Sequence, residues 1–247
     1  MKNSTKSLFM ESKNFISVVV PAFNEEKYLP LCLRAQKAQS FPKNNYEVIV
    51  VDNNSTDSTA KIAKDFGATV ISEPKQGYVF ALNRGMKEAN GAIIAVTDSD
   101  TQVYPNWLSL IKEAFDEENV VAVSGIAKVN TGSSILDLIM NSIFKLFAII
   151  TAMIGKPNIN GFNFAVRRDA FKKVGGLNTD FKMSPDVDLG MRLKEIGEVR
   201  VLNNLTVNTS PRRWQKGFIP ALLEYAKGYI YAAWLRKPPN VRQKVIR

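Results

Sequence analysis

The sequence has no histidine and one cysteine, Cys32, among its 247 residues. Without histidine the chain cannot build a Ser-His-Asp or Cys-His catalytic site or an imidazole metal site. One cysteine excludes an internal disulfide and a cysteine-based zinc site, which suits a reducing cytoplasm. Any acid–base catalysis is therefore expected to use carboxylates.

Long apolar runs are also absent from the N-terminus, where Met1–Asn14 has only Leu8–Met10 as a short apolar group. This group is too short for the apolar core of a signal peptide, so residues 1–14 are expected to be a disordered lead-in. No internal repeat or low-complexity linker divides the rest. The length fits one large domain, residues 15–214, followed by a C-terminal appendage, residues 215–247.

Basic residues exceed acidic ones, with 33 Lys plus Arg against 23 Asp plus Glu and a net charge of +10. This excess predicts an anionic partner, and nucleotide phosphates, anionic lipid headgroups and nucleic acid all qualify. Residues 212–247 hold nine basic residues and one acid, Glu224, a net charge of +8. The excess is therefore concentrated in the appendage.

Short β-branched runs alternate with helical patterns over the first 117 residues. The expected strands are Phe15–Val20, which Pro21 ends, Tyr46–Val51, Thr69–Ile71 and Ala92–Asp98, and the expected helices are Asn24–Gln39, Thr56–Phe66 and Gly77–Ala89. This alternation predicts right-handed crossovers and an α/β fold with a Rossmann-like, mostly parallel sheet. The second half is less regular, with expected strands Val120–Ser124 and Phe162–Val166 and a helix Asp186–Ile196.

Two carboxylates, Asp98 and Asp100, follow the buried apolar run that begins at Ala92. Ligands collect at the carboxyl ends of strands in open α/β sheets. Carboxylate oxygens suit Mg²⁺ or Mn²⁺, which commonly take a few protein ligands plus substrate phosphates. A lone Asp-x-Asp also fits an ordinary solvated turn, because Asp and Ser favour turns.

Four motifs occur in order at the ends of successive strands. They are Val20-Pro-Ala-Phe-Asn-Glu25, Val51-Asp-Asn-Asn-Ser-Thr-Asp57, Gly77 with Ala81, Asn83 and Gly85, and Thr97-Asp-Ser-Asp100. The ordered set resembles a family 2 glycosyltransferase of the GT-A fold, over about Phe15 to Trp214. The resemblance implies an inverting enzyme that takes a sugar from a nucleotide diphosphate donor, most often a UDP- or GDP-sugar, with Mn²⁺ or Mg²⁺. Leu82 departs from the pattern, since many relatives carry Arg there.

The resemblance also implies which half of the domain binds which substrate. Residues 15–117 would bind the nucleotide and residues 118–214 the acceptor. The implied donor residues are Pro21, Ala22 and Glu25 around the nucleoside, Asp52 on the base, Asp98 on the ribose or the metal, and Asp100 on the metal. An acceptor-only carboxylate at Asp52 is able to read a base, but a turn or a helix cap would also use Asp at this position.

A second acidic site lies in Ser184–Leu193, which resembles the family's acidic pair and the helix after it. Pro185 replaces the usual first acid. The resemblance implies that Asp186 is the general base for the acceptor hydroxyl, a role worth about 10²- to 10⁴-fold in rate, and that Asp188 contacts the acceptor. The alternative is that both acids only favour the dipole of the first helical turn.

Ser210-Pro-Arg-Arg-Trp214 is similar to the Gln-x-x-Arg-Trp signature of processive members, with Ser210 in the place of Gln. Processivity therefore stays open. We expect Arg212, Arg213 and Trp214 to contact the acceptor or a phosphate, because guanidinium groups suit phosphate geometry. The alternative is that the arginines belong to an ordinary charged surface.

Two further segments are apolar or aromatic enough to contact a membrane. In Ile135–Ile154 the polar residues Asp137, Asn141 and Lys145 share one helical stripe opposite a broad apolar face. This pattern is compatible with three alternatives: an interfacial or substrate-covering helix, a core helix, or a helix that spans a membrane. After Trp214, aromatic and basic residues interleave as in a membrane-interface anchor, although an amphipathic cap on the sheet also fits.

Together these patterns predict a glycosyltransferase that is peripheral to the cytoplasmic face of a membrane and acts on a glycan, glycolipid or polyprenyl-linked acceptor, without nucleic acid. A close alternative has polyprenyl phosphate itself as the acceptor. A sugar nucleotidyltransferase would need a Gly-rich, basic phosphate loop after the first strand, and Pro21–Glu25 has neither property. A basic membrane- or nucleic-acid-binding module would explain the charge but not the acids at strand ends.

Overall fold

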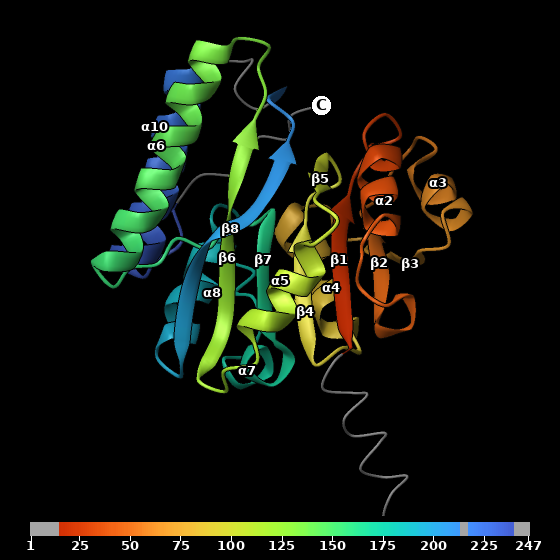
Figure 1. Cartoon of the computed structure of the whole chain (residues 1–247), viewed down its shortest axis with the longest axis horizontal. Coiled ribbons are helices and arrows are strands. Elements are labelled where there is room, and N and C mark those ends of the chain that lie inside the picture. The colour runs from red at the N-terminus through yellow and green to blue at the C-terminus, as the bar shows by residue number, and fades with distance from the viewer. Residues whose placement is uncertain (1–14, 213–216, 240–247) are drawn as a thin grey trace, which may run out of the picture.

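The computed structural model describes residues 15–212 and 217–239, which fold around an eight-stranded sheet in the order β3-β2-β1-β4-β7-β6-β8-β5 (Figure 1). The strands are β1 (Ile16–Ala22), β2 (Tyr46–Asp52), β3 (Thr69–Ser72), β4 (Ile93–Thr97), β5 (Thr101–Val103), β6 (Val120–Val129), β7 (Asn163–Arg167) and β8 (Glu198–Thr209). The α-helices are α2 (Leu29–Lys37), α3 (Thr59–Asp65), α4 (Tyr78–Glu88), α5 (Trp107–Ala114), α6 (Ser134–Met153), α7 (Arg168–Lys173), α8 (Pro185–Lys194) and α10 (Phe218–Ile230). Short 3₁₀ and π-helical turns, Lys43–Asn45 and Tyr231–Leu235, complete the described elements.

The α/β fold class is confirmed, and the parallel pattern holds in the first half. Strands β1 to β4 pair in parallel, and a helix follows each of the first three strands. In the rest of the sheet β7 runs antiparallel to both β4 and β6, and β5 runs antiparallel to β8, while β6 and β8 are parallel. The sheet is therefore mixed, and the two halves of the chain join at the β4–β7 and β5–β8 ladders.

Several element boundaries differ from those expected. Strand β1 continues through Pro21 to Ala22, because its ladder with β4 ends at Val19 and a residue without an N–H is tolerated beside an open edge. Helix α2 begins at Leu29 rather than at Asn24, and Pro30 occupies its first turn, where no N–H partner is needed. The sequence patterns did not predict β5, α5, α7 or β8.

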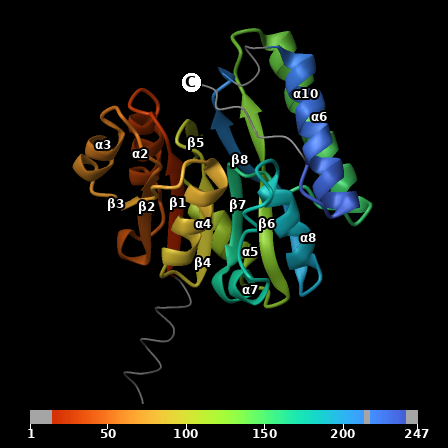
Figure 2. The same cartoon turned by 180° about the vertical axis from the view of Figure 1, so that it is seen from behind.

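Helices cover both faces of the sheet. On one face Val18 and Val20 pack with α2 and α5, including the buried Cys32 and Trp107. On the other face Val19 packs with α4, α7 and α8, which lie on the near side in Figure 2. Successive residues of β1 therefore point to opposite cores, as a strand that is covered on both sides requires.

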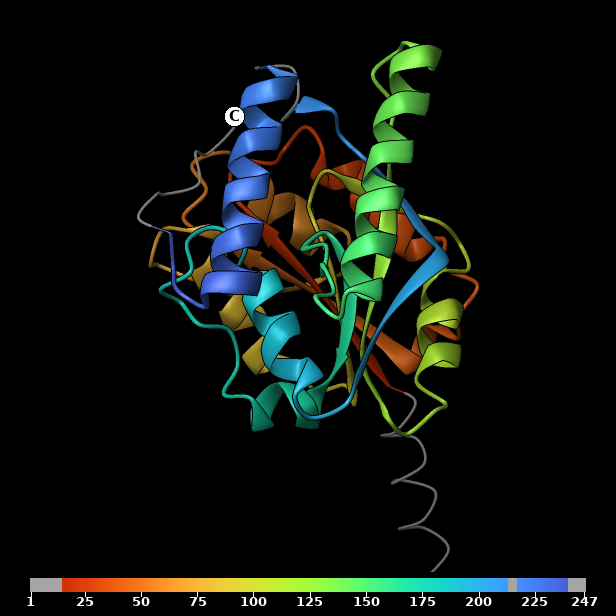
Figure 3. The ribbon, with the colours of Figure 1, turned by 90° about the vertical axis from the view of Figure 1, so that its left-hand side faces the viewer.

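Helices α6 and α10 stand beyond the end of this sandwich as two columns (Figure 3), and α6 packs against β6 and β8. The Phe147 ring of α6 contacts Tyr225 and Tyr229 of α10, with ring centroids 6.1 and 5.0 Å apart. In α6 only Met140, Ala148 and Thr151 are buried, which argues against a plain core helix, one of the three alternatives for this segment.

The face of α6 toward the protein carries polar as well as apolar residues. Asp137 accepts hydrogen bonds from the backbone N–H and the hydroxyl of Thr131, and Asn141 bonds both backbone groups of Val129. The opposite face carries exposed large apolar residues, namely Ile135, Leu136, Leu138, Ile139, Ile143, Leu146, Ile150 and Met153. By length and composition alone, α6 is able to cross a membrane.

Asn163 at the start of β7 provides a test of how the two halves are joined. Its buried amide accepts a hydrogen bond from Trp107 Nε1 at 2.9 Å and donates to the Leu205 carbonyl at 2.8 Å. We expect Asn163→Ala to lower the free energy of unfolding by about 2 to 4 kcal/mol, because it leaves buried groups without partners. Denaturant titration measures this change.

The control is Asn208→Ala, which removes only an exposed hydrogen bond from Tyr104. Its cost is expected to stay below about 1 kcal/mol. Equal costs for the two variants would contradict a joining role for Asn163.

Candidate active site

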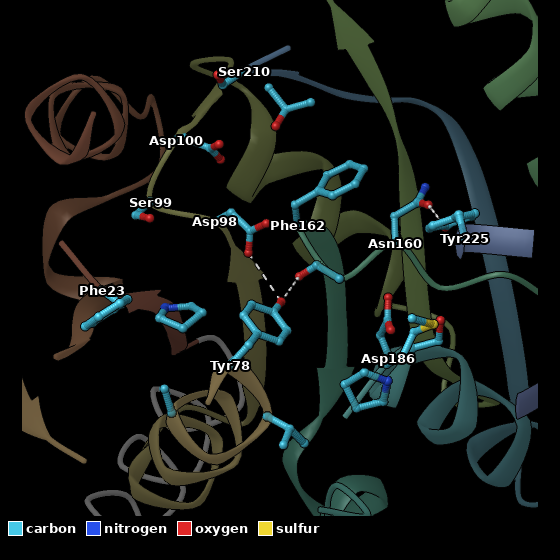
Figure 4. A pocket seen from close by; sticks show the side chains of 18 of the residues that line it. Phe23, Tyr78, Asp98, Ser99, Asp100, Asn160, Phe162, Asp186, Ser210 and Tyr225 are labelled. Carbon is cyan, nitrogen blue, oxygen red and sulfur yellow. Dashed lines mark hydrogen bonds between the residues drawn. The ribbon is translucent and has the colours of Figure 1, made fainter. Parts of the chain in front are cut away.

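A cavity of about 840 Å³ opens at the carboxyl ends of β1 and β4, which is where ligands collect in open α/β sheets (Figure 4). Its walls come from the loops after β1 and β4, the first turns of α4 and α8, the segment before β7, and helices α6 and α10. This volume lies near the upper end of the range for ligand sites. The cavity has room for more than one small molecule.

Interlocking hydrogen bonds hold the loops on one side of the cavity. Asn24 and Asn54 adopt left-handed backbone conformations, with φ of 55° and 63°. Asn24 Oδ1 accepts a hydrogen bond from the Thr56 N–H at 2.8 Å, and the Glu25 N–H donates to Thr59 Oγ1 at 2.7 Å. Left-handed residues that their surroundings hold in place are a common feature of ligand-binding loops.

Asn53 is a buried site residue that the sequence patterns did not single out. Its amide nitrogen donates to the carbonyls of Glu73 and Lys75, both at 2.8 Å, and its oxygen accepts from the Gly77 N–H at 2.7 Å. These bonds fix the loop that leads into α4. They thereby place Tyr78, the first residue of α4, in the cavity wall.

Most of the predicted donor residues line this cavity, namely Pro21, Ala22, Glu25, Asp98 and Asp100. Asp52 ends β2 beside Ala22, but it is not among the described lining residues. Its carboxylate accepts a hydrogen bond from the Ser55 N–H at 3.3 Å, which is the turn contact expected for the alternative interpretation.

Tyr78 links the two predicted acidic sites. Its hydroxyl lies 3.3 Å from Asp98 Oδ1 and 3.2 Å from the Gly161 carbonyl oxygen, and both are hydrogen-bond acceptors (Figure 4). A Cβ atom at Gly161 would lie 3.0 Å from Asp186 Oδ2 and 3.1 Å from the Tyr78 hydroxyl. A side chain at this position would therefore crowd Asp186 and Tyr78.

The backbone before α8 directs Asp186 into the cavity. Ser184 is left-handed with φ of 53°, and Pro185 occupies the first turn of the helix, where its fixed φ is compatible. Asp186 is 9% exposed and lines the cavity wall. Replacement of the family's first acid by Pro185 thus keeps the helix start intact.

Asp188 follows Asp186 by two residues and is not part of the described cavity lining. Its Oδ2 accepts hydrogen bonds from Arg192 Nε at 2.9 Å and Nη2 at 2.7 Å. The same guanidinium donates to the carbonyls of Val174 and Gly176. The geometry fits a residue that positions α8 rather than one that touches an acceptor.

Arg212 bridges two of the predicted donor acids. Its guanidinium donates to Glu25 Oε2 at 3.0 Å and to Asp100 Oδ2 at 2.7 Å, and it lies 4.9 Å from the Tyr28 ring centroid. Burial raises the pKa of Glu25, and the hydrogen bond from Arg212 counteracts part of that rise. Arg213 and Trp214 lie outside the described residues.

The residues present fit a divalent ion that arrives with a phosphate ligand. Among the described residues, no group of three or more His, Cys, Asp or Glu side chains could hold a metal ion. Mg²⁺ sites commonly use only one or two carboxylates plus substrate phosphates. Asp98 and Asp100 supply two carboxylates, and Asp100 already holds a cationic group, the Arg212 guanidinium.

Comparisons with known sequences identify the family. The family described as Glycosyl transferase family 2 matches residues 17–175. Glycosyltransferase AglE of Haloferax volcanii is 29% identical over 243 residues, which cover 93% of this chain and 77% of that protein. A dolichyl N-acetyl-alpha-D-glucosaminyl phosphate 3-beta-D-2,3-diacetamido-2,3-dideoxy-beta-D-glucuronosyltransferase of Methanococcus voltae is 27% identical over 256 residues, with coverages of 90% and 77%.

Solved structures share the fold. The mannosyltransferase PcManGT from Pyrobaculum calidifontis, in complex with GDP-Man and Mn²⁺, superposes with a TM-score of 0.74 at 19% identity, covering 91% of this chain and 65% of that one. Glucosyl-3-phosphoglycerate synthase from Mycobacterium tuberculosis, with Mn²⁺, UDP and phosphoglyceric acid, gives 0.63 at 21% identity, with coverages of 93% and 81%. Since the family match spans more than half of the sequence, the chain belongs to glycosyl transferase family 2, and it is a glycosyltransferase.

Proposed function

We propose that the protein is an inverting, metal-dependent glycosyltransferase that moves a sugar from a UDP- or GDP-sugar to a hydroxyl of a glycan, glycolipid or polyprenyl-linked acceptor. The observation that carries the proposal is that Asp98, Asp100 and Asp186 line one cavity, with Tyr78 and Gly161 between the two acidic sites. The GDP-Man and UDP complexes of proteins with this fold support the donor class.

The proposed step is a single displacement. The acceptor oxygen attacks the anomeric carbon while the Asp186 carboxylate takes the hydroxyl proton, because a neutral alcohol is a poor nucleophile until it is deprotonated. The bond to the donor phosphate breaks, and its electron pair leaves with the nucleoside diphosphate. A divalent ion held by Asp98 and Asp100 would supply Lewis-acid stabilisation of that leaving group.

Polyprenyl phosphate as the acceptor is the second candidate. Its ionised oxygen would need no base, so Asp186 would be dispensable in that reaction. The name of the Methanococcus voltae relative describes a dolichyl-phosphate-linked sugar as the acceptor, which supports a lipid-linked substrate but places the reacting group on a sugar. The first candidate uses Asp186 and is therefore preferred.

A peripheral position on the cytoplasmic membrane face accompanies this function. Exposed apolar residues cover the outer face of α6, and Leu223, Ile230 and Trp234 continue the apolar surface on α10 and the π-helical turn that follows it. The occupant we propose is an anionic lipid surface, because residues 212–247 carry a net charge of +8. Apolar side chains beside basic ones are the composition of interfacial helices.

Asp186→Asn tests the base. We expect turnover to fall by about 10²- to 10⁴-fold while donor binding is retained, because the amide cannot accept the hydroxyl proton. Release of the nucleoside diphosphate in the presence of acceptor measures turnover, and thermal stabilisation by a panel of UDP- and GDP-sugars with Mn²⁺ measures binding. The control is Glu195→Gln, an exposed acid at the end of the same helix. Nearly full turnover of Asp186→Asn would instead favour the phosphate acceptor.

Arg212→Ala tests the competition between a guanidinium and a metal ion at Asp100. Removal of the cation that holds Asp100 is expected to tighten Mn²⁺ binding to the free protein about tenfold, equivalent to about 1.4 kcal/mol. Calorimetric titration with Mn²⁺ measures the affinity. Arg200→Ala is the matched control, since Arg200 pairs with Glu117 and Glu198 away from the cavity. Unchanged affinity in Arg212→Ala would separate Asp100 from the metal site.

Leu138→Gln combined with Met153→Gln tests the membrane surface, because these side chains are 70% and 80% exposed on α6. The pair is expected to reduce binding to vesicles of equal parts phosphatidylglycerol and phosphatidylcholine by about tenfold or more, since two apolar contacts are lost. Cosedimentation measures the bound fraction. Leu31→Gln on α2, at 43% exposure, is the control, and an equal loss there would contradict this surface.

A further inference from the structure

Helix α10 is part of the cavity wall next to Asp186. Ala221, Glu224 and Tyr225 line the cavity from this helix. A Cβ atom at Gly228 would lie 2.4 Å from Ser184 Oγ and 2.8 Å from Met183 Cγ, so the glycine lets α10 rest directly on the turn that precedes α8. The helix is thereby held in a fixed position relative to Asp186.

A fixed polar cluster lies between α10 and the sheet. Asn158 Nδ2 donates to the Tyr225 hydroxyl and to Asn160 Oδ1, both at 2.9 Å. Asn160 is held in turn by Ser124 Oγ at 3.0 Å and by the Gly125 carbonyl at 2.6 Å. Figure 4 shows Asn160 and Tyr225 facing one another on the same side of the cavity as Asp186. Such a preorganised cluster is suited to hydroxyl groups, which donate and accept hydrogen bonds.

The charges on this side of the cavity discriminate between acceptors. Asp186 and Glu224 are both carboxylates, while two cations that also line the cavity, Lys75 and Lys182, lie 4.1 and 4.0 Å from the Phe80 ring centroid. Two carboxylates repel an anionic phosphate, particularly where burial lowers the effective dielectric constant. They accept hydrogen bonds from neutral hydroxyls instead. The reacting group of the acceptor is therefore expected to belong to a neutral sugar.

An apolar wall continues from this polar cluster. Ile126 and Val129 of β6, Phe144 and Phe147 of α6, and Ala221 of α10 line the same cavity. Beyond them lie the outer surfaces of the two helices, where Leu146 of α6 and Leu223 of α10 are exposed. A ligand that extends from Asp186 along this wall therefore needs a polar end at Asp186 and an apolar end toward α6 and α10.

We propose that the part of the cavity between α6 and α10 is the subsite for a lipid-linked neutral sugar. Glu224, together with Tyr225 and Asn158, binds hydroxyls of that sugar and sets specificity. Phe144 and Phe147 contact the start of its apolar chain, which leaves toward the exposed apolar faces of α6 and α10. This inference rests on the proposed glycosyl transfer, because it assigns the acceptor of that reaction.

The test compares three probes below their critical micelle concentrations: octyl β-D-glucoside, methyl β-D-glucoside and octyl phosphate. Ligand-observed NMR titration gives the affinity of each. We expect octyl glucoside to bind more tightly than both others, because it alone combines neutral hydroxyls with a chain. Glu224→Gln is expected to weaken octyl glucoside about tenfold, since hydrogen bonds to a charged group are lost. Phe144→Ala is expected to weaken octyl glucoside but not methyl glucoside.

Leu31→Ala on α2, an exposed residue that is not among the described lining residues of the cavity, is the control and is expected to leave all three affinities unchanged. Tighter binding of octyl phosphate than of octyl glucoside, or unchanged affinity in Glu224→Gln, would overturn the inference. Binding of UDP- and GDP-sugars is measured on every variant. If the wild type binds UDP- or GDP-sugars but octyl glucoside does not show the expected affinities, only the subsite assignment fails. If the wild type binds no UDP- or GDP-sugar, the proposed function itself fails.

Discussion

The structure depends on the placement of several carboxylates around one partly buried cavity. Glu25, Asp98 and Asp100 lie close enough that Asp100 raises the pKa of Glu25, in addition to the larger effect of burial. Without a neighbouring cation this arrangement would be unfavourable, because charges separated from water are poorly screened. The Arg212 guanidinium bonds Glu25 and Asp100 together and offsets their repulsion. A metal ion bound with a nucleotide diphosphate would meet the same requirement.

The register of the sheet explains why the two acidic sites meet. β4 pairs antiparallel with β7, and Thr97 lies opposite Asn163. Because the two chains run in opposite directions, the residues after Thr97 lie beside those before Asn163. Asp98 therefore comes near Gly161 although 63 residues separate them, and Tyr78 fills the space between them. A uniformly parallel sheet would not bring the segment before β7 to this edge.

Much of the first half could be predicted from local patterns, since β-branched runs mark its strands over a few positions. The mixed second half could not. Strand β8 contains exposed Asn203 and Asn204, and its register with β6 shifts between Ser124 and Ile126, so no regular alternation marks it. Tyr78 and Glu224 were missed because their positions in the cavity depend on contacts that are distant in sequence. Asp188 was assigned to the acceptor by resemblance, whereas its partner Arg192 lies four residues further along the same helix, a spacing that the sequence itself shows.

The distribution of charge in the C-terminal segment connects the cavity with the membrane surface. Glu224 is the one acid among residues 212–247, and it lines the cavity. Lys227, Arg236 and Lys237 are exposed on the same part of the described chain and are not among its lining residues. If α10 were only a basic membrane anchor, an acid inside the cavity would reduce its positive charge and would contribute nothing to membrane binding. If it also binds an acceptor, the acid faces neutral hydroxyls while the basic residues face anionic lipid, and both positions follow from one function.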